Sequence, residues 1–269
     1  MMSKVSVITP TYNSAKTIET CIQSVQAQRN VDIEHIVVDG LSTDSTIEIV
    51  RRYPCVKWIS ERDYGIFDAL NKGIDKSTGE FVAICHSDDQ FCSEKTIVTL
   101  VNAMQKEHTE FAYADCVYVH HGKWKRYYKS GNLNKNRLSY GIAPAHTTLV
   151  ARKSLLKLVG DYSLEYPVCS DFEFFTRLLG KSYSYVDKPM VYMGTGGASS
   201  FQFKTAMQIN EQLKKILSDR KIPTSYPKLY FRYLHQQFTS RYNLLVPQGE
   251  KYVSDTWYYA FHRIVRMLI

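Results

Sequence analysis

Residues 81–89 read FVAICHSDD, and this stretch decides the class of fold. Its first five residues are apolar, as expected for a strand that is covered on both faces. Two adjacent carboxylates, Asp88 and Asp89, come directly after this strand. In open α/β sheets, ligands bind at the carboxyl ends of the parallel strands. The stretch therefore predicts a buried parallel strand that ends at a ligand site.

Strand-like and helix-like segments alternate on both sides of this strand, from the first residues to residue 115. For example, Ile18, Cys21, Ile22 and Val25 follow the i, i+3, i+4, i+7 spacing of an amphipathic helix. Strands separated by helices indicate βαβ units and a parallel, doubly wound sheet in an α/β fold. Strands are expected at residues 5–9, 33–38, 56–60, 81–85 and 111–115, and helices at residues 18–25, 45–53, 66–79 and 93–104.

The pattern changes after residue 115. A hairpin is expected over residues 117–128, and shorter strands and one helix follow before residue 202. We expect a catalytic domain at 1–202, with a ligand-binding half at 1–115 and a second half at 116–202, and a helical appendage at 203–269. The shorter elements are strands at 147–151, 183–186 and 190–193, a helix at 170–179, and helical segments at 203–219, 227–244 and 252–268.

The formal net charge of +8 is concentrated in the last quarter of the chain. Residues 203–269 hold 11 basic and 4 acidic residues, so they carry +7, together with many aromatic side chains. A basic, aromatic helical segment fits peripheral contact with an anionic membrane, and it fits equally a helical cap that is packed on the first domain. A nucleic-acid-binding protein is the less favoured class, because no recognition-helix or RNA-binding motif is found.

Composition indicates a folded chain without a membrane span. Hydrophobic residues make up 44% of the 269 residues and the mean hydropathy is −0.29, and no stretch reaches the roughly 18 consecutive apolar residues that a span needs. The first residues lead straight into a strand rather than a signal peptide, so a cytoplasmic location is expected. The six cysteines form no C-x-x-C pair, and we expect reduced, mostly buried thiols.

The carboxylates at the expected strand ends have two interpretations each. Asp88 and Asp89 could hold Mg²⁺ or Mn²⁺, which bind oxygen ligands, or could cap the next helix. Asp39, after the second strand, could accept hydrogen bonds from a base or ribose, or could be a turn carboxylate. No G-x-G-x-x-G or Walker loop is present, so a hydride-transfer enzyme and a P-loop NTPase are both disfavoured.

Five ordered motifs give the chain a specific resemblance. They are residues 9–13 (TPTYN), 38–46 (VDGLSTDST), 60–73 (SERDYGIFDALNKG), 78–80 (TGE) and 87–89 (SDD). Together they resemble the inverting glycosyltransferase family usually numbered two, over about residues 3–200. The resemblance implies the GT-A fold, which is a Rossmann-like mixed sheet flanked by helices, and an enzyme that uses Mn²⁺ or Mg²⁺.

The resemblance also assigns roles to individual residues. Donor or nucleotide binding falls on Pro10, Thr11, Tyr12, Asp39, Asp68, Asn71 and Asp88; the metal on Asp89 with Asp88; the acceptor and diphosphate on His146, Gly196 and Gly197; and the catalytic base on Asp171. Two of these have a structural alternative, because His146 could be a packed polar residue and Asp171 a helix N-terminal carboxylate. Glu173 is expected to have a supporting role rather than to act as a second nucleophile, since residues two apart on a helix point away from each other.

The sequence departs from the family pattern at three positions. His86 stands where Asn or Asp is common, Thr147 where Gln is common, and Leu41 where Gly is frequent. The first departure concerns the metal motif and the second the acceptor contacts.

The implied reaction is metal-dependent inverting transfer of a sugar from a nucleotide-sugar, expected to be a UDP-sugar. The acceptor would be a hydroxyl of a polyprenyl-diphosphate-linked glycan in bacterial surface polysaccharide (O-antigen or capsule) synthesis, on the inner face of the cytoplasmic membrane. A polyprenyl-phosphate acceptor is the alternative within the same enzyme class. The basic run at residues 123–137 could hold an acceptor's pyrophosphate or could be a solvated hairpin.

Overall fold

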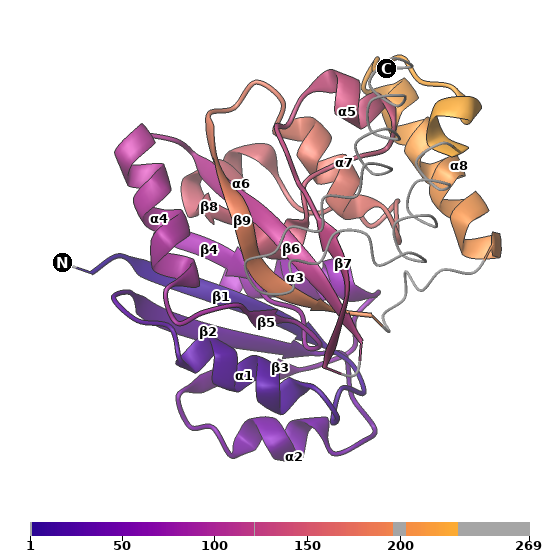
Figure 1. Ribbon diagram of the computed structural model, residues 1–269. Coiled ribbons are helices and arrows are strands. Elements are labelled where there is room, and N and C mark those ends of the chain that lie inside the picture. Colours follow the sequence, from indigo (N-terminus) through magenta and orange to yellow (C-terminus); the bar gives the residue numbers. More distant parts are fainter. Residues whose placement is uncertain (1, 121, 196–202, 231–269) are drawn as a thin grey trace.

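The computed structural model describes residues 2–120, 122–195 and 203–230, with side chains of the last segment from residue 207 (Figure 1). Within these residues, nine strands form one sheet in the order β3-β2-β1-β4-β8-β6-β9-β5, and β7 pairs with β6. The strands are β1 Lys4–Thr11, β2 Asp32–Asp39, β3 Val56–Ser60, β4 Phe81–Ile84, β5 Gln90–Phe91, β6 Phe111–His120, β7 Lys123–Tyr128, β8 Val150–Arg152 and β9 Tyr183–Gly194. The helices are α1 Ile18–Gln26, α2 Thr46–Arg51, α3 Ile66–Lys76, α4 Thr96–Glu107, α5 Lys135–Ser139, α6 Lys153–Val159, α7 Ser170–Arg177 and α8 Phe203–Asp219, with a 3-10 helix at His146–Thr148.

The first four strands form the expected parallel half of the sheet. β1 pairs in parallel with β2 on one side and with β4 on the other, and β2 pairs in parallel with β3. The expected strands at the beginning of the chain are thus confirmed, and their carboxyl ends meet at one edge of the sheet.

The second half makes the sheet mixed, as the resemblance implied. β8 lies between β4 and β6 and is antiparallel to both, whereas β6 and β9 are parallel. The strand expected at 147–151 begins only at Val150, because the residues before it form the 3-10 helix. Thr148 donates its hydroxyl to Ala145 O at 2.7 Å, which favours the tight turn over an extended backbone.

Helices cover both faces of the sheet (Figure 1). The side chains of β6 alternate between two hydrophobic cores, one on each face of the sheet. Phe111 and Tyr113 belong to the core that includes residues of α3, α6 and α7. Ala112 and Ala114 belong to the core that includes residues of α1 and α4. α3 lies close against β1 because Gly73 has no side chain; a Cβ there would lie 2.3 Å from Ile8 Cγ2.

Several expectations for the second half need adjustment. The two short strands expected at 183–186 and 190–193 are one irregular strand, β9, and α5, α6 and β5 were not expected. The helix expected at 203–219 is confirmed, and its Leu213, Ile216 and Leu217 belong to the same core cluster as α3 and α7. Gly196, Gly197 and nearly all of the segments expected at 227–244 and 252–268 lie outside the described residues.

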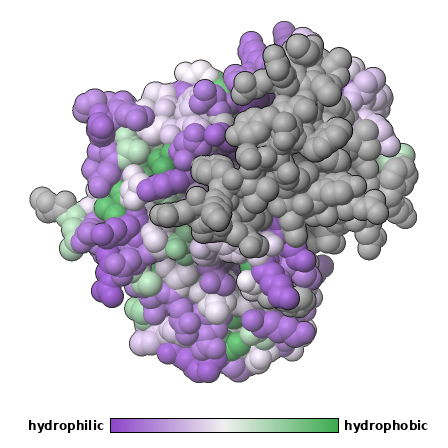
Figure 2. Space-filling model, in the orientation of Figure 1, coloured by the Kyte–Doolittle hydropathy of each residue, from purple (hydrophilic) through white to green (hydrophobic). Residues whose placement is uncertain are grey.

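The surface and the cysteines agree with the composition. Figure 2 shows a face that is mostly hydrophilic in its described part, with scattered hydrophobic residues. Among the helices that the structure describes, none is both long and apolar enough to cross a bilayer. The cysteines are free, and Cys21, Cys85, Cys116 and Cys169 are buried.

Glu34 on β2 ties several elements together opposite the ligand edge. Its side chain is 3% exposed, and it accepts hydrogen bonds from Lys57 of β3 at 2.7 Å, from Ser6 of β1 at 2.5 Å, and from the backbone and hydroxyl of Thr78 before β4, both at 2.7 Å. Burial alone would raise the pKa of Glu34, but these four donors outweigh burial and lower it to about 2.

We expect Glu34→Gln to lower the free energy of unfolding at pH 7 by roughly 2–3 kcal/mol. Because the pKa of Glu34 is lowered on folding, its stabilisation is present above the ordinary value of 4.5 and disappears as the pH falls towards about 2. Urea unfolding of both proteins at a series of pH values should show their stabilities converge in that window. Glu48→Gln, at an exposed position of α2, is the matched control. A constant difference between wild type and E34Q down to pH 2 would contradict this account.

Candidate active site

The last residues of β1, β2 and β3 lie side by side at the carboxyl edge of the sheet. Thr11 is in register with Asp39, and Asp39 with Ser60. The carboxylate of Asp39 is fully buried and accepts hydrogen bonds from Ser60 Oγ at 2.6 Å and from the backbone N–H of Ser42 at 3.1 Å. Asp39 therefore fixes the turn after β2, at the place where the resemblance puts base recognition.

The loop after β1 is tied to the loop after β2. The side-chain oxygen of Asn13 accepts a hydrogen bond from Thr43 N at 2.8 Å, and Asn13 N donates to Ser42 Oγ at 2.8 Å. Tyr12 is 61% exposed beside this junction, whereas Pro10 is buried in β1. Thr11 Oγ1 is buried and has no hydrogen-bond partner among the described residues. The carboxyl edge of the sheet thus has the exposed ring of Tyr12 next in sequence to the Thr11 hydroxyl, which has no hydrogen bond within the described residues.

Asp68 and Asn71 lie on α3, and each is hydrogen-bonded to the backbone of a loop next to this helix. Asp68 accepts a hydrogen bond from Tyr64 N at 3.1 Å and lies 3.3 Å from Lys72 Nζ. Asn71 donates its amide to Tyr162 O at 2.9 Å and accepts from Tyr162 N at 2.8 Å. Asn71 therefore joins α3 to the segment before α7, a function that sequence reasoning missed.

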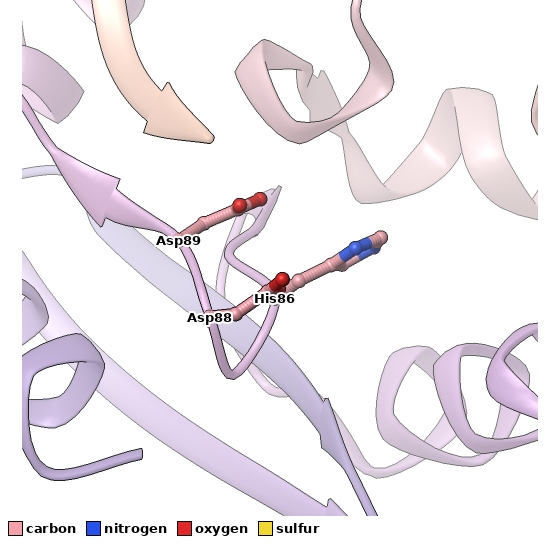
Figure 3. A group of neighbouring side chains, drawn as sticks. All are labelled: His86, Asp88 and Asp89. Atoms are coloured by element: carbon pink, nitrogen blue, oxygen red, sulfur yellow. The ribbon is translucent and has the colours of Figure 1, made fainter. Parts of the chain in front are cut away.

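The acidic loop between β4 and β5 gathers three side chains. His86, Asp88 and Asp89 each offer one ligand atom, and these atoms lie within 4.8 Å of one another. Figure 3 shows that all three side chains leave the loop on the same side. Gly194, the last residue of β9, donates its N–H to Asp89 Oδ1 at 2.9 Å. A Cβ at Gly194 would lie 2.5 Å from Asp88 Oδ2, so only glycine allows β9 to approach so closely.

The interpretation of the acidic pair as a helix cap is wrong. The next helix, α4, begins at Thr96, its N-cap residue is Lys95, and it has no side-chain capping bond. Asp89 is instead buried, and Asp88 half-buried, in the loop that follows β4. Burial raises the pKa of Asp88, and burial together with the charge of Asp88 raises the pKa of Asp89 well above its usual range.

This loop fits a divalent cation. Asp89 Oδ2 is buried and accepts no hydrogen bond from any residue that the structure describes. A buried carboxylate oxygen without a partner is unfavourable unless a positive charge meets it. Mg²⁺ and Mn²⁺ bind carboxylate oxygens, and Asp88 and Asp89 offer such oxygens close together.

A chain of contacts leads from this loop to Asp171. The Nε2 atoms of His86 and His146 are hydrogen-bonded at 2.9 Å, and His146 Nδ1 lies 3.3 Å from Asp171 Oδ2. The side chain of Asp171 is 33% exposed, so it can meet a substrate, and that of His146 is 12% exposed. Both ring nitrogens of His146 therefore face polar side chains, those of His86 and Asp171.

A stack of aromatic rings connects α3 to α7. Tyr162 stacks between Phe67 of α3, at 5.6 Å between centroids, and Phe174 of α7, at 4.5 Å. The ring of His146 lies 6.4 Å from that of Phe67. The stack positions His146 beside the beginning of α7, where Asp171 lies.

Glu173 pairs with two arginines. It is buried, and its carboxylate lies 2.9 Å from Arg177 and 2.5 Å from Arg220. Arg177 also donates to the backbone oxygens of Val159 at 2.7 Å and Asp161 at 2.7 Å. Glu173 thus anchors α7 to the segments around it.

The basic run at 123–137 is only partly solvated. Arg126 is buried, with its guanidinium 4.2 Å from the Tyr118 ring, and Lys129 pairs with Asp187 at 3.1 Å. Lys123 and Lys125 are exposed and make no ion pair within the described ranges. The solvated-hairpin interpretation therefore fits Lys123 and Lys125 but not Arg126, and the binding of an acceptor's pyrophosphate stays a prediction.

The contact between His86 and His146 could not be found from the sequence. The two residues are 60 positions apart, and the only signal was that His86 replaces the Asn or Asp common at its position.

Known proteins resemble this chain in sequence and in fold. A model of the family described as Glycosyl transferase family 2 matches residues 6–158. A PGL/p-HBAD biosynthesis glycosyltransferase of Mycobacterium tuberculosis is 28% identical over 180 residues, which cover 64% of this chain and 68% of that protein. The structure of the 1–349 segment of S. aureus TarS in complex with UDP-GlcNAc covers 81% of this chain and 71% of that chain, with 24% identity and a TM-score of 0.62. A mannosyltransferase from Pyrobaculum calidifontis in complex with GDP-Man and Mn²⁺ covers 89% of this chain and 81% of that chain, with 16% identity and a TM-score of 0.59.

The family match spans more than half of the chain and contains the strand ends and the acidic loop described above. The mixed sheet flanked by helices is the same in the solved glycosyltransferases. The chain belongs to glycosyl transferase family 2 and is a glycosyltransferase with the GT-A fold.

Proposed function

We propose that the protein transfers a sugar from a UDP-sugar to a hydroxyl of a lipid-diphosphate-linked glycan, with inversion at the anomeric carbon and with a divalent cation. The glycan would belong to a bacterial surface polysaccharide such as O-antigen or capsule. The observation that carries the proposal is the contact chain from the acidic loop through His86 and His146 to Asp171. These contacts support the proposal because they connect the proposed base with the proposed site of the leaving diphosphate.

Asp171 is the proposed general base. Its Oδ1 accepts a hydrogen bond from Phe172 N at 2.8 Å, and its Oδ2 faces His146 and solvent. A carboxylate there can take the proton of an acceptor hydroxyl as the oxygen attacks the anomeric carbon. His146 Nδ1 orients this carboxylate. When bound, a cation at Asp88 and Asp89 would stabilise the negative charge of the departing nucleoside diphosphate.

Inversion is favoured over retention because the second carboxylate of α7 is already engaged. A retaining double displacement needs a carboxylate nucleophile near the anomeric carbon in addition to the acid–base group. Glu173, the nearest acidic residue in sequence, is buried between Arg177 and Arg220. Asp171 is therefore the carboxylate of this helix that remains accessible.

The donor is proposed to bind at the carboxyl edge of β1–β3. The exposed ring of Tyr12 can stack on a base, and Thr11 Oγ1 and the turn that Asp39 fixes provide polar contacts. UDP is preferred over GDP because the TarS complex contains UDP-GlcNAc and shares more sequence with this chain than the GDP-Man complex does. The sugar then lies towards Asp68, with the diphosphate towards Asp88.

A diphosphate-linked acceptor is supported by the hairpin of β6 and β7. Lys123 and Lys125 on β7 are exposed cations without an acidic partner in the described part of the chain. Such side chains can meet the phosphates of a lipid diphosphate. A bare polyprenyl phosphate is the competing acceptor, and it differs chemically because an ionised phosphate has no proton for a base to remove.

We expect Asp171→Asn to lower kcat by about 10²–10⁴-fold, since general base catalysis contributes that much to such reactions. Sugar transfer to a lipid-diphosphate glycan and UDP binding would be measured together, and UDP binding should be unchanged. Glu173→Gln is the comparison on the same helix, and it should lower thermal stability far more than kcat. Full activity of D171N would exclude a hydroxyl acceptor with Asp171 as base and would favour the phosphate acceptor.

Two buried carboxylates should respond in opposite ways to removal of their charge. Asp115 on β6 also has a raised pKa because of burial, but it accepts hydrogen bonds from Tyr127, from Tyr185 at 2.7 Å and from Ser130 N at 2.8 Å. We expect Asp115→Asn to destabilise the protein by about 1–3 kcal/mol, because these donors lose a charged acceptor. Asp89→Asn should raise the melting temperature of the metal-free protein by a few degrees, since ~1 kcal/mol corresponds to about 2–4 °C for a domain of this size.

Melting curves in EDTA and with Mn²⁺ plus UDP test this difference. D89N should lose the stabilisation by Mn²⁺ and the metal-dependent release of UDP, whereas D115N should keep both. If D89N melts below the wild type in EDTA, or if Mn²⁺ still stabilises it, Asp89 is not the metal ligand.

We also propose that the protein works on the inner face of the cytoplasmic membrane, held there by residues 203–269. This segment carries a net charge of +7, and each basic residue near an anionic surface contributes about 1 kcal/mol. The full chain should float with vesicles of phosphatidylglycerol and phosphatidylcholine at low salt, and not with phosphatidylcholine alone. Salt of about 1 M, where the Debye length is about 3 Å, should release it. Equal flotation with neutral vesicles would contradict electrostatic attachment.

A further inference from the structure

His86 lies in the acidic loop close to both of its carboxylates. One of its ring nitrogens lies within 4.8 Å of ligand atoms of both Asp88 and Asp89. Its Nε2 is hydrogen-bonded to His146, and Nδ1 has no hydrogen bond among the residues that the structure describes. The side chain leaves the loop on the same side as the two carboxylates (Figure 3).

The contacts of His146 determine which nitrogen of His86 carries the proton. The carboxylate of Asp171, 3.3 Å from His146 Nδ1, favours a proton on that nitrogen. In a neutral imidazole the other nitrogen is then an acceptor, so His146 Nε2 accepts the hydrogen bond. His86 must donate from Nε2, which leaves the lone pair of its Nδ1 free.

We propose that His86 Nδ1 is a nitrogen ligand of the cation, together with Asp88 and Asp89, and that His146 and Asp171 hold His86 in the tautomer that ligation requires. This inference rests on the proposed function, because it assumes that the acidic loop binds the cation. A metal-ligating histidine that donates its other ring N–H is the usual arrangement, since that hydrogen bond fixes the tautomer and the ring orientation.

A nitrogen ligand changes the preference of the site among cations. Mg²⁺ prefers oxygen ligands throughout, whereas imidazole binds transition metals more favourably. The site should therefore prefer Mn²⁺ to Mg²⁺ by about tenfold or more, and the preference should fall towards parity in His86→Asn. Asparagine is the informative replacement because it keeps a possible oxygen ligand and removes the imidazole.

Electron spin-echo envelope modulation of Mn²⁺ bound to the full chain tests the inference directly. Mn²⁺ alone is the probe, and the protein is compared with and without ¹⁵N-labelled histidine. We expect modulation from a directly bound imidazole nitrogen, its replacement by the ¹⁵N pattern in the labelled protein, and its loss in H86N. His108→Asn, at an exposed histidine after α4, is the matched control and should keep the signal.

His146→Ala tests the positioning part with the same probe. The Mn²⁺ affinity should fall by about 10–100-fold, as is typical when the hydrogen-bond partner of a ligand is removed, while His86 still gives the nitrogen signal. Unchanged affinity in a folded H146A protein would overturn the positioning role.

Two outcomes separate this inference from the proposed function. If Mn²⁺ binds and sugar transfer proceeds but no histidine nitrogen is coupled, or if H86N keeps the coupling, His86 is not a ligand and the proposed function stands. If Mn²⁺ does not bind at all, the inference and the metal dependence of the proposed function both fail.

Discussion

The carboxylate of Asp89 lies buried at the end of a parallel strand, and its Oδ2 has no partner among the described residues. Burying a carboxylate costs free energy unless polar or charged partners meet it, and this limits which residues can surround it. The end of β9 approaches with a glycine and donates a backbone N–H to Oδ1, and no capping role uses the other oxygen. What remains is a carboxylate oxygen that a cation can bind, at the edge of the sheet where β1, β2 and β3 also end.

The antiparallel strand β8 explains how His146 comes to this edge. Val150 at the beginning of β8 is in register with Ala83 near the end of β4. Because the two strands run in opposite directions, the residues just before β8 lie where β4 ends. His146 is thereby brought to His86, although 60 residues separate them. A fully parallel sheet would place the beginning of that strand at the opposite edge, far from the acidic loop.

The sequence predicted the features that depend on a few neighbouring residues, such as hydrophobic periodicity and the ends of strands. The parallel half, the helix containing Ile18 and Ile22, and the placement of Asp39 and Asp89 at strand ends all follow from runs of a few residues. It could not show that β8 inserts antiparallel between β4 and β6, because pairing between distant strands leaves no local signal. For the same reason it could not show that Asn71 bonds to Tyr162, or that the departure at His86 has a partner in His146.

The two imidazoles connect Asp171 with the acidic loop, through the hydrogen bond between His86 and His146 and the 3.3 Å contact between His146 and Asp171. The carboxylate of Asp171 faces His146 Nδ1, His146 is hydrogen-bonded to His86, and a ring nitrogen of His86 lies within 4.8 Å of carboxylate oxygens of the loop. Groups that share such a network are not energetically independent, so the effects of changing the base and of changing the loop should not add. We therefore expect a change in the loop to affect the orientation of Asp171, so that the proposed base and the proposed cation site are coupled through the protein.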